Sequence, residues 1–439
     1  MKRTALSLLC LLVAGGCNGQ TKDSPELLAR KFVEMLSRKE FAKAYATMDE
    51  TMAAAITEEK LGLIWLQING QFGAYSHQKD ATVESAGGYT TVRLTCAFER
   101  SDLIVQVSYD LRGKVSGLYF KPPKKSYSLP TPSYMDTSKF IELPATVSSG
   151  EYALLATLSM PKGSGPFPAV VLVHGSGPND RDESIGPNKP FRDLAWGLAS
   201  QGIAVLRYEK RTRSHPKYYQ ANPYYTVKDE VTDDADSALA LLRRTKGVNG
   251  RSIYLLGHSL GAYLAPRIAF SKKDIAGIIM LAAPTRHLED LVVEQTRYIA
   301  ENEPQGDKAT MDKQISMMDK ARAEILALKP ADSARTVLGV PGSYWLDLAK
   351  YDVVTTAKNL QMPSLIMQGE RDYQVTMTDF NSWKKELVDN KYATLKSYPK
   401  LNHLFIEGEG KCKPSEYERE GFVAPYVIEY IVKWVKGQK

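Results

Sequence analysis

The spacing of apolar residues between positions 24 and 120 predicts a small domain of helices followed by strands. Apolar side chains first recur at the spacing typical of helices with one buried face. They then alternate with polar side chains, which is typical of half-buried strands. Helices are expected from Pro25, at 40–48 and at 57–71, and strands at 81–85, 90–98, 103–109 and 115–120. Helices that precede an antiparallel sheet form an α+β unit.

Beyond residue 135, strands and helices alternate along the chain. The run Ala169–Val173 is continuously apolar and mostly β-branched, as in a strand buried on both faces. Further strands are expected at 139–144, 152–160, 203–208, 253–256, 275–281, 363–367 and 394–398, with helices at 191–201, 227–244, 262–270 and 425–436. This order indicates an α/β fold whose mostly parallel, doubly wound sheet carries helices on both faces. The first two strands suit an antiparallel pair at the sheet edge.

Two breaks in this pattern define the domain organisation. Residues 121–134 are rich in Pro and Ser, so we expect an extended linker between a domain at 24–120 and a second at 135–439. At about 285–359, long charged helical segments replace the alternation, and an insertion of this size is expected to form a helical lid. Met317 and Met318 either give this lid an adaptable apolar wall or pack against the core.

Composition and charge exclude several function classes. The 439 residues are 43% apolar and 24% charged, which suits a folded, soluble protein of more than one domain. The net charge of +7 comes from basic residues dispersed among acidic ones, which argues against a nucleic-acid partner. The sequence contains no paired C-x-x-C, H-E-x-x-H or phosphate-binding motif, so we expect no metal and no cofactor. Cys96 and Cys412 are expected to be free thiols, and no pattern indicates an oligomeric state.

The N-terminal residues resemble a bacterial lipoprotein signal. Two basic residues precede a short apolar run, and the small residues Ala14-Gly15-Gly16 then lead to Cys17. The apolar run is too short to span a bilayer as a mature helix. The resemblance implies that residues 1–16 are removed and that a lipid on Cys17 anchors the chain in the bacterial cell envelope. Asn18 favours the outer membrane, and a plain secretory signal is the alternative.

The candidate chemistry centres on Gly257-His258-Ser259-Leu260-Gly261, a G-x-S-x-G sequence. An apolar run precedes it and a helix-compatible run follows, and in this context the motif forms a nucleophile elbow. Glycines are needed because side chains at the flanking positions would clash with the strand and the helix. The turn would expose the Ser259 hydroxyl at the sheet edge, where the helix N-terminus favours developing negative charge. A surface Gly-Ser turn is the alternative.

A second glycine-rich loop supports this interpretation. The strand Ala169–Val173 leads into His174-Gly175-Ser176-Gly177-Pro178, which resembles the oxyanion loop of the α/β-hydrolase superfamily. With the elbow and the strand–helix order, residues 135–439 resemble the small serine esterase and aminopeptidase-like branch of that superfamily. The resemblance implies an α/β-hydrolase fold whose oxyanion hole uses the backbone N–H groups of Ser176 and Leu260. A turn that needs glycine for geometry alone is the alternative, and His174 is expected to be structural.

The same resemblance assigns the remaining catalytic residues. The strand at 363–367 ends in a loop that resembles the hydrolase acid loop, where the spacing favours Asp372 over Glu370 as the acid. His403 follows the last strand in an Asn-His dipeptide that resembles the catalytic histidine loop. The chain order Ser259, Asp372, His403 matches that of this fold. His403 would act as general base and then acid, and Asp372 would hold the imidazole tautomer.

Two further resemblances concern residues outside the candidate triad. Gly70-Gln71-Phe72-Gly73, with Trp65 before it, resembles a small domain of unknown function, similar to nuclear transport factor 2, in front of some bacterial hydrolases. The run Arg207–Arg211 resembles a tract that related esterases continue with glycine. Thr212 stands there instead, which implies a different loop conformation and an altered pocket.

These observations predict a serine hydrolase that cleaves a small-molecule carboxylic ester through an acyl-enzyme. Peptide or thioester hydrolysis by the same triad is the main alternative. A thioesterase is less expected because coenzyme A thioesters are cytoplasmic, and the sequence does not identify a group that anchors a peptide terminus. An envelope binding lipoprotein with a vestigial hydrolase domain is the alternative from another class. Labelling of Ser259 by a fluorophosphonate probe separates an active from a vestigial domain.

Overall fold

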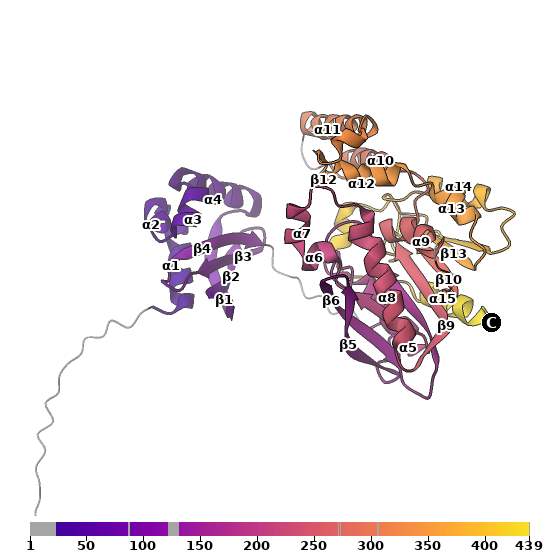
Figure 1. The fold of residues 1–439 in the computed structure, drawn as a ribbon. Helices are drawn as coiled ribbons and strands as arrows, with labels where there is room; N and C mark the ends of the chain where they lie inside the picture. Colours follow the sequence, from indigo (N-terminus) through magenta and orange to yellow (C-terminus); the bar gives the residue numbers. More distant parts are fainter. Residues whose placement is uncertain are drawn as a thin grey trace, which may run out of the picture. The chain divides into compact units, whose positions relative to one another are not determined.

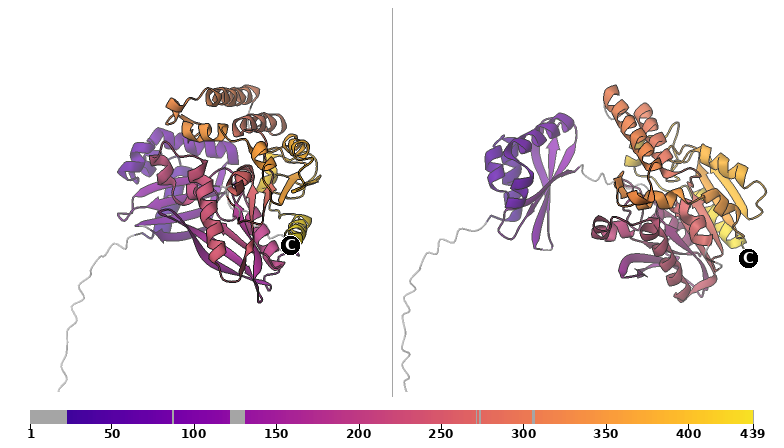
Figure 2. Two further views of the ribbon diagram at one scale, coloured as in Figure 1. Left: turned by 45° about the vertical axis from the view of Figure 1, so that its right-hand side comes forward. Right: turned by 45° about the horizontal axis from the view of Figure 1, so that its top comes forward.

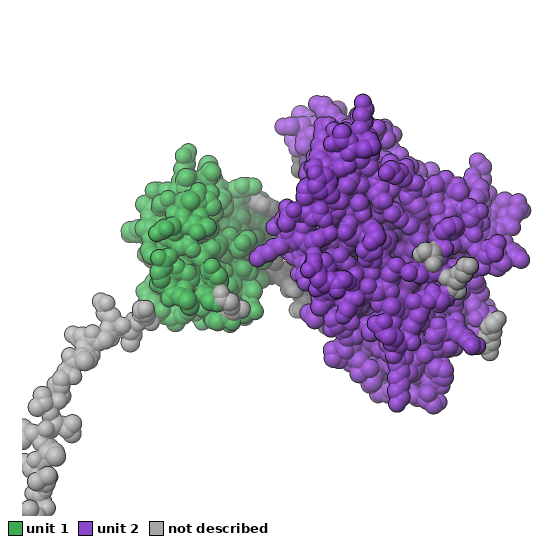
Figure 3. Space-filling view, viewed as in Figure 1, with its two compact units in different colours: residues 1–126 green, residues 127–439 purple. Residues whose placement is uncertain are grey.

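The computed structural model describes residues 23–86, 88–121, 131–270, 272, 274–304 and 307–438. The expected signal peptide, the expected lipidation site Cys17 and most of the expected linker lie outside the described residues. The chain divides into two compact units, residues 1–126 and 127–439 (Figure 3). Among the described helices, none is both long enough and apolar enough to cross a membrane.

The described residues of the first unit form four helices and a four-stranded antiparallel sheet in the order β1-β2-β3-β4. Its elements are α1 (Pro25–Ser37), α2 (Phe41–Ala46), α3 (Glu50–Ala55), α4 (Glu58–Phe72), β1 (Tyr75–Ala86), β2 (Tyr89–Phe98), β3 (Asp102–Tyr109) and β4 (Val115–Lys121). Every second residue of β3 is buried, because the helices cover one face of the sheet (Figure 1). The predicted α+β character is therefore confirmed.

One helix of this unit was not predicted, and the bounds of two other elements differ from the sequence prediction. Residues 50–55 form the unpredicted helix α3, which begins where Asp49 accepts a hydrogen bond from the Met52 N–H (2.7 Å). Helix α2 ends at Ala46 because Met48 pairs with Val115 of β4. Strand β1 begins at Tyr75 and not at residue 81, and as an edge strand it has few buried side chains to reveal the alternation.

An eight-stranded sheet forms the centre of the second unit, in the order β14-β13-β10-β9-β7-β8-β6-β5. Its strands are β5 (Phe140–Ser149), β6 (Tyr152–Pro161), β7 (Phe167–Val173), β8 (Ala204–Tyr208), β9 (Val248–His258), β10 (Gly277–Leu281), β13 (Ser364–Gly369) and β14 (Ala393–Tyr398). The strands from β14 to β8 run parallel, whereas β6 pairs antiparallel with both β8 and β5. The predicted antiparallel pair at the edge is confirmed.

Helices cover both faces of this sheet (Figure 1). Helices α5 (Pro190–Ser200) and α15 (Pro425–Gly437) pack on one face, and α8 (Asp233–Arg244) and α9 (Leu260–Phe270) pack on the other. Alternate residues of β7 accordingly point into two different cores, with Val171 in one and Val170 in the other. A strand in this position has no solvent-facing side, which explains its continuous apolar sequence.

An insertion of helices separates β10 from β13. It contains α10 (Leu288–Asn302), α11 (Lys308–Leu326), a hairpin of β11 (Thr336–Val337) and β12 (Val340–Pro341), α12 (Gly342–Ala349) and α13 (Val353–Lys358). Helices α10 and α11 lie side by side (Figures 1 and 2). Further short elements include α6 (Arg211–Ser214), α7 (Pro216–Ala221), a π-helical turn (Lys228–Thr232) that leads into α8, and α14 (Met377–Glu386).

Candidate active site

Ser259 occupies a sharp turn between the carboxyl end of β9 and the first residue of α9. Its backbone is in the left-handed region, with φ at +53°, and its N–H donates to the carbonyl of Leu281 on β10 (2.9 Å). A Cβ on Gly257 would lie 2.2 Å from the carbonyl oxygen of Gly261, and a Cβ on Gly261 would lie 2.2 Å from that of Val173. Both glycines are therefore required by the turn, which has the geometry of a nucleophile elbow.

Asp372 and His403 lie in the loops after β13 and β14 and form a buried pair. The two atoms Nδ1 of His403 and Oδ2 of Asp372 are 2.7 Å apart. Because a carboxylate only accepts, Nδ1 carries the proton and Nε2 is left as an acceptor. The other carboxylate oxygen, Oδ1, accepts the backbone N–H groups of Gln374 (2.8 Å) and Val375 (3.0 Å). The acid is therefore held from both sides.

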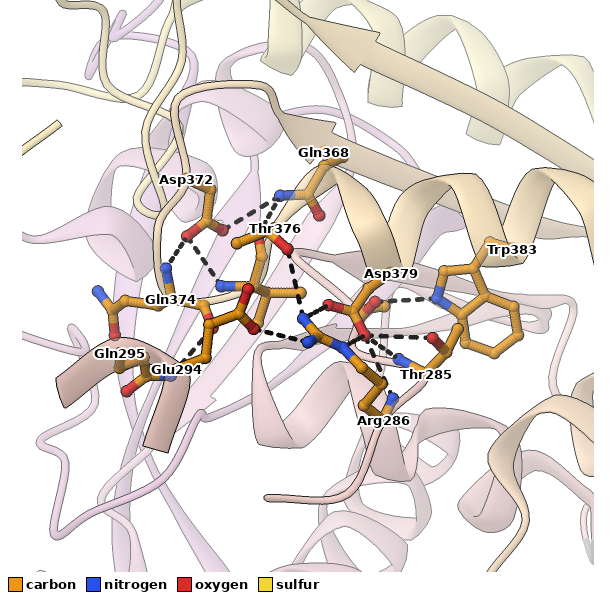
Figure 4. Close-up of polar contacts among 12 residues, drawn as sticks. Thr285, Arg286, Glu294, Gln295, Gln368, Asp372, Gln374, Thr376, Asp379 and Trp383 are labelled. Atoms are coloured by element: carbon orange, nitrogen blue, oxygen red, sulfur yellow. Dashed lines mark hydrogen bonds and ion pairs between the residues drawn. The ribbon is translucent and has the colours of Figure 1, made fainter. Parts of the chain in front are cut away.

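Gln368, at the end of β13, is a further member of this site that the sequence did not indicate. Its buried amide donates to Oδ2 of Asp372 (3.2 Å) and to the carbonyls of Gly369 (3.0 Å) and Val375 (2.8 Å), and Figure 4 shows it beside the acid. Glu370, the rival carboxylate, is exposed and accepts a hydrogen bond from Ser397 (2.8 Å). The geometry thus favours Asp372 as the partner of the imidazole.

The elbow and the histidine loop are joined through His258. Its Nε2 donates to the backbone carbonyl of His403 (2.9 Å), and the two ring centroids are 4.6 Å apart. Ser259, the next residue, is partly exposed. Among the described residues no hydrogen bond joins the Ser259 hydroxyl to His403, so the proton transfer between them belongs to the proposal below.

His258 also forms a buried ion pair with Glu183, which the sequence did not single out either. Nδ1 of His258 and Oε2 of Glu183 are 3.0 Å apart. Burial lowers the pKa of His258, but the Glu183 carboxylate more than compensates and leaves that pKa raised. Burial raises the pKa of Glu183, yet His258 leaves it lowered. Oε1 of Glu183 accepts the Gly175 N–H (2.6 Å), so this pair connects the elbow to the glycine-rich loop.

The glycine-rich loop lies against Ser259. A Cβ on Gly175 would be 3.2 Å from the Cβ of Ser259. Ser176 is exposed, and the N–H of Leu260, the first residue of α9, is one of the groups that a helix leaves without an intrahelical partner. His174 is buried below the loop between Phe191 and Tyr208, with Nε2 3.0 Å from the Asp180 carbonyl oxygen. Burial lowers the pKa of His174 to about 4, which suits a structural residue.

A cavity of about 80 Å³ opens at the Ser259 side chain. Its lining is Ser176, Ser259, Leu260, Tyr263, Pro284, Arg286, Leu288, Leu291, Val292, Gln295, Gln374 and Val375. The apolar wall from the insertion is formed by α10 and not by Met317 and Met318 on α11, the first of which is exposed. Thr212 and the tract before it do not line the cavity, so the expectation that this tract alters the pocket stays a prediction.

Helix α10 and the residues before it contact α14 and the loop that carries Asp372 through an ion pair, hydrogen bonds and stacked rings. Arg286 pairs with the buried Asp379 of α14 (Nη2 to Oδ2, 2.7 Å) and donates to Thr376 (3.3 Å), as Figure 4 shows. Gln295 donates to the carbonyl of Gln374 (2.9 Å). The rings of Tyr298 and Tyr373 also stack at 4.9 Å. The apolar wall of the cavity and the loop that carries Asp372 are therefore one connected body.

No other cluster competes with this site among the residues that the structure describes. A larger open hollow of about 540 Å³ between α10 and α11 is lined mainly by arginines and carboxylates, and each of the three arginines pairs with a lining carboxylate. Cys96 and Cys412 are free and buried, and burial raises the pKa of each thiol to about 12. Within the described ranges, no group of three or more His, Cys, Asp or Glu residues has a metal-binding arrangement.

Comparisons with known proteins cover both units. The family described as serine aminopeptidase S33 matches residues 166–409, and a family of unknown function, DUF3887, matches residues 29–118. Esterase EstD of Thermotoga maritima is 39% identical over 407 residues, which cover 92% of this chain and 93% of that protein. Est1E from Butyrivibrio proteoclasticus is 17% identical, with a TM-score of 0.42, and covers 67% of this chain and 98% of that chain. The esterase domain of a Rhodothermus marinus protein is 14% identical, with a TM-score of 0.41, over 68% of this chain and 98% of that chain.

Proposed function

The chain belongs to the serine aminopeptidase S33 family of hydrolases, and we propose that it hydrolyses carboxylic esters through an acyl-enzyme on Ser259. A 39% identical esterase that aligns with nearly the whole chain supports this reaction. The observation that carries the residue assignment is a convergence at one cavity. Ser259, Ser176 and Leu260 line it, and the His403–Asp372 pair is tied to the same elbow through His258.

In this proposal the Asp372–His403 pair makes the Ser259 hydroxyl a competent nucleophile. His403 Nε2 accepts the proton of Oγ as Oγ attacks the ester carbonyl carbon. The resulting oxyanion accepts hydrogen bonds from the N–H groups of Ser176 and Leu260. His403 returns the proton to the leaving alkoxide, and the alcohol departs. A water molecule deprotonated by His403 then hydrolyses the acyl-enzyme, while Asp372 stabilises the imidazolium in both steps.

The cavity favours a short acyl group. Leu288, Leu291 and Val292 of α10 give it an apolar wall, and its volume is about 80 Å³. Protein cavities that hold benzene measure about 150 Å³, so acetyl to butyryl groups fit and aromatic acyl groups do not. The finer proposal is that the insertion at 285–359 covers the substrate entrance as a lid, of which α10 is the part that lines the cavity.

The test is hydrolysis of p-nitrophenyl esters from acetyl to dodecanoyl by soluble protein that starts after Cys17. We expect turnover that is highest for short acyl chains, labelling by a fluorophosphonate probe, and loss of both in Ser259→Ala. Ser237→Ala, a change on helix α8 outside the cavity lining, is the matched control and should keep both. Turnover that survives in Ser259→Ala would overturn the assignment of the nucleophile.

The remaining outcomes separate the alternatives. Labelling of the wild type without turnover of any ester would overturn the esterase proposal and direct the search to peptides, in keeping with the family's description. Absence of both labelling and turnover would favour a binding lipoprotein with a vestigial hydrolase domain.

We further propose that the protein is a lipoprotein of the bacterial cell envelope, held in the outer membrane by a lipid on Cys17. The small residues before Cys17 and the short apolar run support this location. Metabolic labelling with an alkyne fatty acid, followed by membrane fractionation, provides the test. We expect a labelled membrane protein and a Cys17→Ser variant without the label. A wild type that stays unlabelled would refute the anchor.

A further inference from the structure

We infer that Lys210 is a positioning residue of the oxyanion hole, acting through the backbone carbonyl of Gly175. The inference rests on the proposed function and extends it to three linked, buried side chains, those of Lys210, Glu230 and Tyr344. These side chains, named here the clamp, are separate from the Asp372–His403 pair and do not line the cavity.

The clamp consists of buried side chains joined by short hydrogen bonds and an ion pair. Nζ of Lys210 is 2.7 Å from the carbonyl oxygen of Gly175 and 2.6 Å from Oε1 of Glu230. Oε2 of Glu230 accepts the hydroxyl proton of Tyr344 (2.7 Å). The side chains of Lys210 and Glu230 are 2% and 7% exposed, and Tyr344 is also buried. Each group therefore has a charged or polar partner in place of water.

The clamp sets the direction of one N–H group. In a trans peptide the C=O of Gly175 and the N–H of Ser176 point in opposite directions. Lys210 and the Asn179 side chain (3.2 Å) both donate to that carbonyl, and Glu183 holds the Gly175 N–H (2.6 Å). The peptide plane before Ser176 cannot rotate without breaking these bonds. The Ser176 N–H itself has no hydrogen-bond partner among the described residues and is available to an oxyanion.

The charge on Lys210 adds to this geometry. A carbonyl that accepts a hydrogen bond from an ammonium group is polarised, and polarisation along the peptide makes the N–H on its other side a stronger donor. A neutral side chain of the same length would fill the same space without this effect. Lys210 thus both orients the Ser176 N–H and strengthens it.

The energetics also favour a functional role. A buried ion pair seldom adds stability over an apolar pair of similar volume, because desolvation offsets the attraction. The protein nevertheless buries the Lys210–Glu230 ion pair beneath the glycine-rich loop. Glu230 stands in a π-helical turn, a distortion that often marks functional sites. Tyr344 comes from α12 of the insertion, so the clamp also anchors the insertion to the oxyanion loop.

The experiment compares the double variant Lys210→Met plus Glu230→Leu with the wild type. Removing both charges avoids a lone buried charge, which alone could unfold the protein. We expect a folded enzyme whose KM stays within about threefold and whose kcat falls by about 100-fold, the scale of a compromised oxyanion donor. Lys228→Met removes the lysine of an exposed ion pair in the same π-helical turn and is the matched control.

A transition-state analogue gives the readout that a merely structural role would not move. The hemiketal formed by a trifluoromethyl ketone on Ser259 places an oxyanion in the hole, so its affinity should weaken by the same factor as kcat/KM. Inhibition by the alcohol product, which needs no oxyanion, should stay unchanged. Equal weakening of both inhibitors, or a kcat within threefold of the wild type, would overturn the role of Lys210.

Two additions keep the result decisive. If the double variant does not fold, Tyr344→Phe removes only the last link of the clamp. It should lower kcat by about three- to tenfold at constant KM, a loss on the scale of one to two hydrogen bonds. An unchanged kcat would overturn the inference. A wild type that neither turns over esters nor labels would overturn the proposed function, and the inference with it. An active wild type with an unaffected variant would overturn the inference alone.

Discussion

Replacing Asp372 with asparagine should leave its loop folded but give His403 the wrong tautomer. Oδ1 of Asp372 accepts the N–H groups of Gln374 (2.8 Å) and Val375 (3.0 Å), so the amide oxygen of asparagine will take that position. The amide nitrogen then faces Nδ1 of His403 and donates to it. The imidazole proton moves to Nε2, where it blocks acceptance of the proton of Ser259.

The magnitude follows from these contacts. With the general base held in the inactive tautomer, we expect kcat to fall about 10⁴-fold, or about 5.5 kcal/mol. The new amide nitrogen also faces Nε2 of Gln368, which donates to Oδ2 of Asp372 (3.2 Å) in the native protein. Two N–H groups then meet with no acceptor between them. The free energy of unfolding should therefore fall by about 1–3 kcal/mol.

The assay is kcat and KM for p-nitrophenyl acetate, with urea unfolding as the stability measurement. Glu370→Gln is the matched control, because Glu370 lies two residues away and its carboxylate is at the surface. It should stay within about twofold of the wild type. The reasoning is refuted if Asp372→Asn keeps more than a tenth of the wild-type kcat, or if Glu370→Gln loses as much.

Three further predictions test the elbow, the cavity and a buried histidine. Gly261→Ala should unfold or inactivate the second unit, because its Cβ would lie 2.2 Å from the Val173 carbonyl oxygen. Gly250→Ala should keep the second unit folded and active, because its Cβ meets nothing within 4 Å. Thermal unfolding of the two variants provides the comparison. Leu291→Ala should widen the cavity and move the highest kcat/KM to a longer acyl chain; an unchanged profile would exclude Leu291 as its wall. Burial lowers the pKa of His174 to about 4 from 6.5. Between these pH values the unfolded chain binds a proton that the folded chain does not, so the free energy of unfolding falls as the pH decreases, by up to about 3 kcal/mol. Urea unfolding at pH 7 and pH 4.5 should show a smaller loss for His174→Gln, and equal losses would contradict the prediction.

Much of the fold could be predicted because its signals are local. Strands β7 and β13 are buried on both faces, and this burial shows as continuous apolar runs. Ser259 and Asp372 stand directly after or a few residues after such strands, and His403 follows the partly buried edge strand β14. The parallel sheet brings these strand ends to one edge. Prediction failed where a signal was weak or depended on pairing, as in helix α3 and the exposed edge strand β1.

The polar residues around the site are a different case. Gln368, Glu183 and Lys210 each hold a functional group in place, yet no pattern in the sequence assigns any of them this role. Lys210 was noted only as part of the run Arg207–Arg211, and its partner Gly175 lies 35 residues earlier in the chain. From sequence alone, a single lysine or glutamate is predicted to be exposed to solvent, because such residues are rarely buried.

The sequence by itself determined most of the order of strands and helices and the three positions at strand ends where catalytic chemistry was expected. These follow from side-chain periodicity and from glycines in tight turns, which depend on neighbours along the chain. Only the tertiary structure decided that α10 and not the methionines of α11 lines the cavity, and that Glu183 and Lys210 hold the two sides of Gly175. The physical reason is that the role of a buried polar group depends on the partner it meets, and folding supplies that partner from a distant part of the chain.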